Sequence, residues 1–223
     1  MAVSYLDNMF NKGNYEYLNP SQNRYGNLEL HTYSATQVVT RTELKSQLRI
    51  DTSDEDTLLD TYISAATMMA ENYCNRHFIN ARYDLNFLKE LPSKFSLYYP
   101  DVTLDTSHSA TEDDGLFTRP NSITDPVTPV TSTEYYIDRY SNPCYVALNE
   151  SVSTATDEFK STYLGNYLFR FTTGMGTAAS DIPDAIKQAI KLIAADMYYF
   201  REDRKRAFPM ASEILLQPYK CYL

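Results

Sequence analysis

The sequence predicts an α+β protein with an antiparallel helical core, a small antiparallel β-sheet or hairpin insertion, and extended terminal arms. Apolar residues recur at helical spacing over two long stretches, 54–76 and 183–204. In each predicted helix they would form one apolar stripe along one face. Between them, residues 78–172 change to short runs rich in Tyr, Phe, Val and Thr, separated by Pro, Gly, Asp and Ser, a texture typical of strands and turns. We therefore expect the two long helices to pack together, with a short helix over 40–49 beside them.

The late helix, 183–204, has the clearest signals. Pro183 suits the first helical position, and Asp181 and Asp184 suit the positive end of the helix dipole. Its apolar residues recur at spacings of three and four: Ile186, Ala189, Ile190, Ile193, Ala194 and Met197. An apolar stripe this wide must be buried against another element, and the predicted helix over 54–76 is the other stretch long enough to pack against it.

Capping signals place the two earlier helices. Thr40 and Glu43 have the spacing of a capping box, in which each side chain bonds to the other residue's backbone amide. The segment Thr52–Glu55 offers a second capping box for the helix over 54–76. Small side chains on this helix would let another helix approach closely: Ala65, Ala66 and Ala70.

Six runs between the long helices are candidate strands: 81–87, 95–99, 102–104, 134–138, 144–148 and 167–172. The polar, proline-broken segment 107–133 is expected to be a long loop or projection. Thr172–Ser180 contains two glycines and is expected to form the turn into the late helix.

Three regions follow from this reading: an extended N-terminal arm (1–36), a core domain (37–204) that includes the β-rich insertion, and a C-terminal docking tail (205–223). The arm is rich in Asn, Tyr and Ser and shows no sustained period. The tail has apolar side chains for which we expect no cover from the core, and we predict that they form an interface: Phe208, Pro209, Ile214, Leu215, Leu216, Pro218 and Tyr219.

Composition excludes several classes of function. The net charge of −9 argues against a protein that wraps nucleic acid through its phosphates. No stretch approaches the roughly 18 apolar residues of a membrane span, so we expect no membrane partner and synthesis in the cytoplasm. Three widely spaced cysteines indicate neither a disulfide framework nor a zinc site. The 20 tyrosines, with no tryptophan, favour surfaces that are covered on assembly.

No pattern indicates catalysis, a cofactor or a metal. The three histidines are far from one another and from the cysteines. Gly174-Met175-Gly176 follows a strand, but the phosphate-loop motifs are incomplete there, so we expect a structural turn. One basic cluster ends the late helix and would either match the helix dipole or contact an acidic partner or passing DNA: Arg201, Arg204, Lys205 and Arg206.

Three blocks of the sequence have distinctive motifs. The first block is TELKSQLRID at 42–51, with the early helix through Tyr73 after it; the second is IPDAIKQAI at 182–190, followed by Tyr198, Tyr199 and Arg201-Glu202; the third is ILLQPYK at 214–220. In this order, the three blocks resemble the head-to-tail connector (adaptor) proteins of tailed bacteriophages. The resemblance covers the two helical blocks and the tail. Residues 1–36 and the long middle depart from the shorter members of the family.

The resemblance implies a structural virion protein with no enzymatic activity, located in the neck at the head-to-tail interface. Such proteins form a ring, usually of twelve copies, beneath the portal. The ring extends the DNA channel without sequence-specific binding and offers a surface to a tail or stopper protein. On this reading, the apolar side chains of the tail would dock on the portal or on an adjacent subunit, and acidic walls would let DNA slide.

Two other functions stay open. A stopper or tail-terminator protein of the same neck would also form rings. A small phage enzyme acting on host polysaccharide would need a pair of carboxylates, for which the candidates are Asp101, Asp105, Glu112, Asp113 and Asp114.

Overall fold

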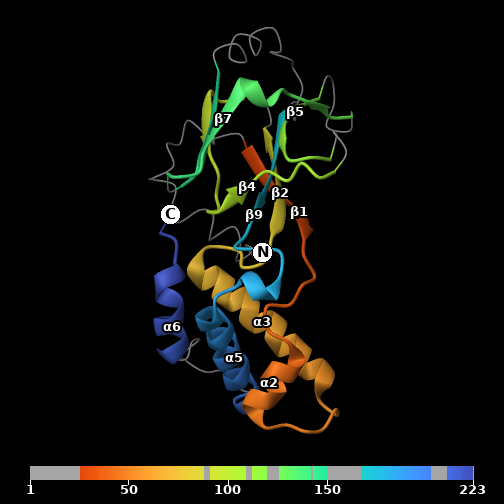
Figure 1. Cartoon of the computed structure of the whole chain (residues 1–223), viewed down its shortest axis with the longest axis vertical. Coiled ribbons are helices and arrows are strands. Elements are labelled where there is room, and N and C mark those ends of the chain that lie inside the picture. Colours follow the sequence, from red (N-terminus) through yellow and green to blue (C-terminus); the bar gives the residue numbers. More distant parts are fainter. Residues whose placement is uncertain are drawn as a thin grey trace, which may run out of the picture. The chain divides into compact units, whose positions relative to one another are not determined.

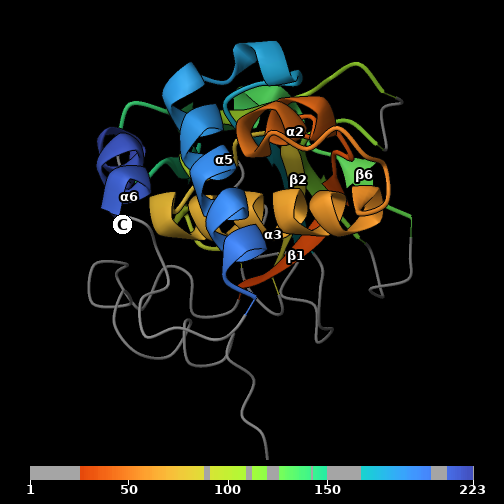
Figure 2. The same ribbon diagram turned by 90° about the horizontal axis from the view of Figure 1, so that it is seen from below.

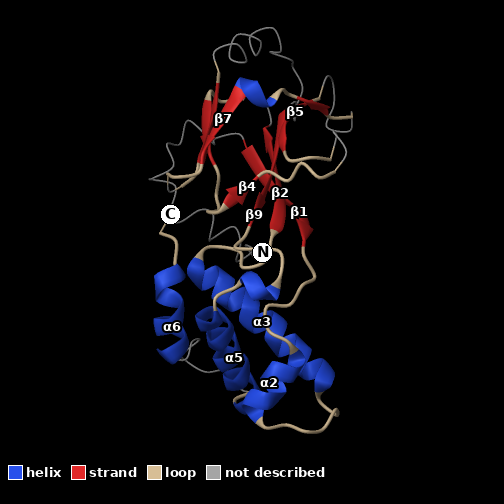
Figure 3. Ribbon diagram, viewed as in Figure 1, coloured by secondary structure: helices blue, strands red, loops and turns tan. Residues whose placement is uncertain are grey.

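The computed structural model describes residues 26–87, 91–108, 112–119, 126–141, 143–149, 167–201 and 210–222. The chain divides into two compact units, which we call the β unit (26–33 and 81–173) and the helical unit (34–80 and 174–222). The described α-helices belong to the helical unit and the antiparallel strands to the β unit (Figures 1 and 3), so the predicted α+β class is confirmed. The division differs from the single core expected over 37–204.

Four α-helices make up the described part of the helical unit: α2 (Arg41–Leu48), α3 (Asp56–Cys74), α5 (Asp184–Tyr199) and α6 (Met210–Leu216). Two 3-10 turns accompany them, η2 (Ala179–Asp181) and η3 (Gln217–Tyr219). Figures 1 and 2 show α5 between α6 and α2, with α3 packed against it. The expected pairing of the two long helices is therefore present within one unit.

The apolar stripes predicted from the sequence form the core of this unit. Ile63, Ala66 and Ala70 of α3 and Ile186 and Ile190 of α5 are all at most 1% exposed. They belong to one cluster with the buried residues of α2 and α6. Alanines on α3 leave room for the larger isoleucines of α5, which is how helices interdigitate at close range.

The two predicted capping boxes have different outcomes. The first is confirmed: the Thr40 amide donates to the Glu43 carboxylate at 2.7 Å, and the Glu43 amide donates to the Thr40 hydroxyl at 3.3 Å. The second is wrong, because Glu55 is the N-cap of α3 and makes no side-chain cap. Its carboxylate instead accepts from the Tyr198 hydroxyl and the Arg201 guanidinium, at 2.6 and 2.7 Å.

The late helix is shorter than expected. Pro183 is its N-cap, and the helix ends at Tyr199 rather than at 204. Phe200 has an extended φ of −125° and caps the helix. The chain leaves the helical path there, where Arg201 pairs with Glu55 at the start of α3.

The β unit contains two antiparallel sheets. The larger has the order β1-β2-β9-β5-β6, with β4 also paired to β9, and the smaller has the order β3-β8-β7. The strands of the larger sheet are β1 (Gly26–Tyr33), β2 (Ala81–Phe87), β4 (Val102–Thr103), β5 (Gly115–Thr118), β6 (Thr128–Pro129) and β9 (Tyr167–Thr173). Those of the smaller are β3 (Lys94–Ser96), β7 (Tyr135–Asp138) and β8 (Tyr145–Leu148), with the 3-10 turn η1 (Ser132–Glu134) before β7.

Three strands correct the sequence-based expectations, one of them the two-residue β6 within the expected loop 107–133. Residues 26–33 of the expected arm form β1, which pairs along the whole of β2 with one bulge between Leu30 and Thr32. Residues 115–118 of the expected loop form β5, which pairs with β9 and is largely buried. The β-rich insertion is therefore larger than the small sheet or hairpin predicted, and one of its strands comes from the N-terminal region.

Aromatic side chains join the two sheets. Phe95 of β3 packs against Phe87 of β2, with ring centroids 4.8 Å apart, and against Phe169 of β9 at 5.5 Å. All three are fully buried. Edge-to-face contacts of this kind add to the free energy of burial, so the β unit has a hydrophobic core of its own.

A glycine turn leads from β9 into the late helix, as the sequence predicts. Gly174 has a φ of +144°, which side chains rarely allow. A Cβ built there would lie 2.8 Å from the backbone N and Cα of Asn80. The Asn80 amide in turn donates to the carbonyl of Gly176 at 2.9 Å. This close approach gives the turn a structural role.

We predict that Gly174→Ala lowers the free energy of unfolding by about 1–3 kcal/mol, because it combines backbone strain with a contact to main chain that has no room to shift. Denaturant titration followed by circular dichroism measures the change. The matched control is Thr177→Ala, at an exposed position in the same turn, which should alter stability by less than about 0.5 kcal/mol. Equal effects of the two substitutions would contradict the strain argument.

Candidate assembly surfaces

The C-terminal helix α6 packs on the helical unit through one face. Ser212 and Leu216 are fully buried, and Leu215 and Tyr219 contact the same core. The expectation that the tail's apolar side chains find no cover is therefore wrong for Leu215, Leu216 and Tyr219. Their cover is the core built around α5.

The opposite face of α6 remains apolar and exposed. Met210 and Ile214 are 60% and 64% exposed, and Pro218 in η3 is also exposed. Met210 and Ile214 are four residues apart and therefore lie on the same side of α6. We call these two side chains, together with Pro218 in the turn that follows, the α6 outer face. Ordinary surface helices are polar on the side away from the core. Of the other predicted interface residues, Phe208 and Pro209 lie outside the described residues.

The segment after α6 is bound to the end of α3. The Cys221 amide donates to the Cys74 carbonyl at 2.8 Å, and the Asn75 side chain donates to the Cys221 carbonyl at 2.9 Å. The ammonium group of Lys220 lies 4.6 Å from the centre of the Tyr73 ring. These contacts hold the segment that follows α6 against the end of α3.

Of the predicted basic cluster, one residue, Arg201, lies within the described part of the chain. Arg201 pairs with Glu55, and its guanidinium lies 5.4 Å from the centre of the Tyr198 ring. Hydrogen bonds from Tyr198 and Arg201 lower the pKa of Glu55. The acidic partner of Arg201 is thus within its own chain, while Arg204, Lys205 and Arg206 lie outside the described residues.

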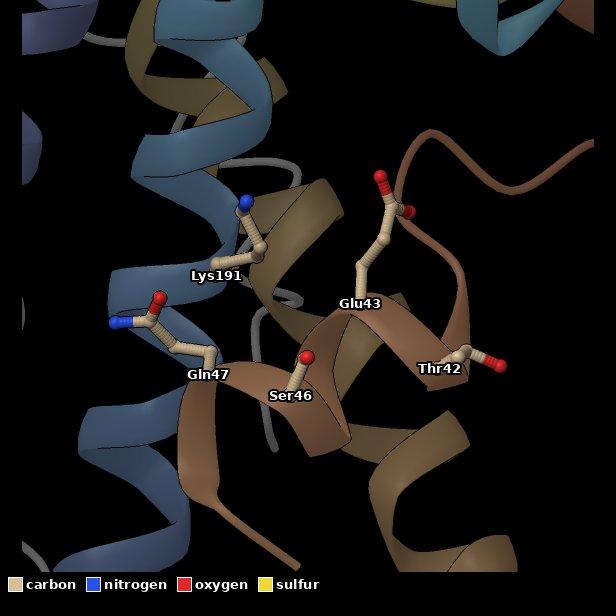
Figure 4. Close-up of a pocket in the computed structure, with 5 residues that line it drawn as sticks. All are labelled: Thr42, Glu43, Ser46, Gln47 and Lys191. Atoms are coloured by element: carbon tan, nitrogen blue, oxygen red, sulfur yellow. The ribbon is translucent and has the colours of Figure 1, made fainter.

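A shallow hollow of about 380 Å³ lies between α2 and α5 (Figure 4). Polar side chains line it: Thr42, Glu43, Ser46 and Gln47 from α2, and Lys191 from α5. The Glu43 carboxylate is already bound by the amide and hydroxyl of Thr40, and these hydrogen bonds, with help from Lys191 and Lys187, lower its pKa. The hollow therefore contains a helix cap, and its polar groups do not converge on a ligand position.

Three of the five carboxylates considered for glycan hydrolysis accept hydrogen bonds within the β unit: Asp105, Asp113 and Asp114. Asp114 is buried; it accepts from Arg82 at 2.5 Å, from the Thr172 hydroxyl at 2.6 Å and from the Asp105 amide at 2.9 Å. The side chain of Asp105 accepts from the amide and hydroxyl of Ser107. Arg82 also donates to the Glu112 carbonyl. This network fixes a loop on the sheet, and its buried carboxylate already has a full set of partners.

A second buried ion pair lies on the same face of the sheet. Arg170 of β9 donates to both oxygens of Asp84 on β2, at 2.7 and 2.8 Å, and His31 of β1 lies 3.5 Å from Asp84. The hydrogen bonds to Asp84 raise the pKa of Arg170. A buried charge is tolerated when it is paired in this way. Because the three side chains come from β1, β2 and β9, the cluster links these strands.

Within the described ranges, no group of three or more His, Cys, Asp and Glu residues could hold a metal ion. None of the described helices is long and apolar enough to cross a membrane. Of the surfaces described above, the α6 outer face is the one with apolar groups left exposed on an ordered scaffold.

Comparisons with known proteins agree with the resemblance seen in the sequence. Residues 40–106 match the family described as "Phage gp6-like head-tail connector protein". The matched segment contains α2, α3 and the strands β2 to β4. No curated protein matches the sequence.

Three solved structures share the fold. A chain from the neck of an empty gene transfer agent (GTA) particle, computed with C6 symmetry, has a TM-score of 0.65 and 20% identity, covering 88% of this chain and 96% of that one. A chain from the native GTA neck, computed with C12 symmetry, has a TM-score of 0.61 and 19% identity with the same coverage. A chain from the native GTA virion has a TM-score of 0.61, 20% identity and again the same coverage.

The Glu43 cap predicts a specific dependence on pH. Because the folded-state pKa of Glu43 lies below its ordinary value of 4.5, the ionised carboxylate stabilises the fold above that value, and the contribution is lost as pH falls through the folded pKa. Glu43→Gln should therefore lower stability at pH 7 by roughly 0.5–1 kcal/mol, with the difference from wild type shrinking below about pH 4.

Denaturant titrations between pH 7 and pH 3 measure this effect. Asp51→Asn, at an exposed loop position, serves as the control and should show no such convergence. Curves for wild type and Glu43→Gln that stay parallel over the whole range would contradict the assignment.

Proposed function

We propose that this chain is a structural, non-enzymatic protein of the neck of a tailed phage or phage-like particle, and that it is a head-to-tail connector of the adaptor kind. The proposal rests on two agreeing observations: the match of residues 40–106 to the connector family, and a fold shared over 88% of the chain with a protein of the GTA neck. Made in the host cytoplasm, it would take its place at the head-to-tail interface of the virion.

In this proposal the chain forms a ring, with twelve copies, beneath the portal. The similar necks were computed with C6 and C12 symmetry, which is the support for this copy number. The ring would extend the DNA channel and offer its other side to a tail or stopper protein. A net charge of −9 suits a channel wall along which DNA passes without being held.

The surface proposed for docking on the portal or an adjacent subunit is the α6 outer face. Exposed apolar groups on a rigid helix face are suited to an apolar groove on a partner. Leu216 is buried, and the Cys221 amide is hydrogen-bonded to the Cys74 carbonyl. A truncation before α6 would therefore disturb the helical unit as well as the interface. Substitutions on the outer face test the interface alone.

A stopper or tail terminator is the second candidate, since the comparisons concern necks as a whole and do not separate the roles. Order of binding distinguishes them: an adaptor binds a purified portal ring directly, whereas a stopper or terminator requires another neck protein first. Mass photometry of the chain mixed with its portal, followed by electron microscopy of the complex, tests the proposal. A chain that stays monomeric and leaves the portal unchanged would contradict the adaptor role.

We predict that the double substitution Met210→Asp/Ile214→Asp weakens binding to the portal ring at least about tenfold, because two charges would have to be buried in an apolar contact. Binding is measured by mass photometry or biolayer interferometry, and thermal melting checks that the fold is kept.

The matched control is Met68→Asp on α3, where the side chain is 62% exposed, close to the exposure of Met210 and Ile214. It should bind as wild type does. If the double variant binds the portal ring as wild type does, the α6 outer face is not part of the interface.

A further inference from the structure

Two of the three cysteines come together at one end of the helical unit. Cys74 is the last residue of α3, and Cys221 lies in the segment that follows α6. The amide of Cys221 donates to the carbonyl of Cys74 at 2.8 Å, and standard bond lengths then hold the two Cα atoms within about 6 Å of each other. Disulfides span Cα separations of about 4.4–6.8 Å, so the backbone already has the spacing of a disulfide.

Neighbouring contacts fix the register of the two segments. On one side of the pair, the Asn75 side chain donates to the Cys221 carbonyl at 2.9 Å. On the other, Arg76 donates to the Tyr219 carbonyl at 3.4 Å. The Cys74 thiol lies 3.8 Å from the carbonyl of Leu216, the last residue of α6. Several hydrogen bonds therefore keep the end of α3 and the segment that follows α6 close together.

The two thiols differ in access. Cys74 is fully buried, whereas Cys221 is half-buried. Burial raises the pKa of the Cys74 thiol to about 12, and the nearby Cys221 thiol contributes to the rise. Thiol exchange begins at the more accessible sulfur, which in this pair is Cys221.

We propose that Cys74 and Cys221 are a redox-sensitive pair that closes into an intramolecular disulfide when the protein meets a low-molecular-weight disulfide such as oxidised glutathione. The Cys221 thiol loses its proton, and the thiolate attacks one sulfur of the reagent and expels one glutathione thiolate. Cys74 then loses its proton and attacks the Cys221 sulfur, expelling the second. Two protein thiols are oxidised, one reagent disulfide is reduced to two thiols, and the protons released are taken up by these products.

The bond would join the end of α3 covalently to the segment that follows α6. In the reduced state that segment is held by hydrogen bonds, which local opening can break. In the oxidised state α6 would be confined between α5 and the new cross-link. The long chain segment between the two cysteines makes the expected stabilisation of the folded state large.

The experiment uses the full chain with Cys144→Ala, which removes the third thiol, and wild type in parallel. Folded protein is incubated with oxidised glutathione at pH 8, quenched with acid, denatured and treated with a maleimide. Trypsin should then release the peptide 50–76 linked to the peptide that begins at Cys221, because cleavage follows Arg49, Arg76 and Lys220. Dithiothreitol should separate them, and the Tm should rise by roughly 5 °C or more on oxidation.

Two controls test the geometry. Cys221→Ser should show no linked peptide and no shift in Tm. In protein unfolded by urea, the equilibrium constant for forming the disulfide with oxidised glutathione should be at least about tenfold smaller than in folded protein, because the fold no longer holds the two cysteines together. The proposal is overturned if both thiols remain reactive to maleimide, if oxidation stops at a glutathione adduct of Cys221, or if closure in urea equals closure in the folded protein.

Discussion

The packing of α3 against α5 is the interaction on which the helical unit depends. The two helices are separated in sequence by the strands β2 to β9, so closing this contact carries the entropic cost of a long loop. That cost is offset by burial of the apolar stripes, in which small side chains such as Ala66 and Ala70 meet isoleucines such as Ile190. The other helices then pack on this pair, with α2 and α6 on either side of α5 (Figure 2).

The surfaces proposed for assembly follow from this packing. Because Leu216 is buried and the Cys221 amide is hydrogen-bonded to the Cys74 carbonyl, α6 and the residues after it are part of the helical unit, and the exposed apolar side chains of α6 lie on its outer face. The β unit has a separate aromatic core around Phe95 and Phe169, and its buried charges are paired within its own sheet. Each unit therefore has a hydrophobic core of its own.

The sequence predicted the features that arise from local patterns. The stripes of both long helices and the Thr40–Glu43 capping box depend on spacing within one segment, and the structure confirms them. The cap predicted for α3 failed because Glu55 has stronger partners, Tyr198 and Arg201, which come from a distant part of the chain. Helix ends and caps are open to such competition from tertiary contacts.

Other features were missed because their signal lies in pairing partners. The strand β1 is mostly polar and has a bulge after Leu30, so its alternation is broken, and its pairing with β2 is not visible in the segment itself. The strand β5 has only four residues between polar segments and is defined by its contact with β9. In α6 both Ile214 and Leu216 are apolar, and only the rotation of the docked helix decides that one is exposed and the other buried.

Native-state hydrogen exchange tests the central claim, that α3 and α5 form one cooperative scaffold. Ile190→Ala creates a cavity between the helices and should cost about 2–5 kcal/mol. If the two helices form one unit, the amides of Ile63–Ala70 on α3 should lose protection to the same extent as those of α5. Wild-type protection of α3 beside a loosened α5 would show that the helices are stable independently, and would contradict the account.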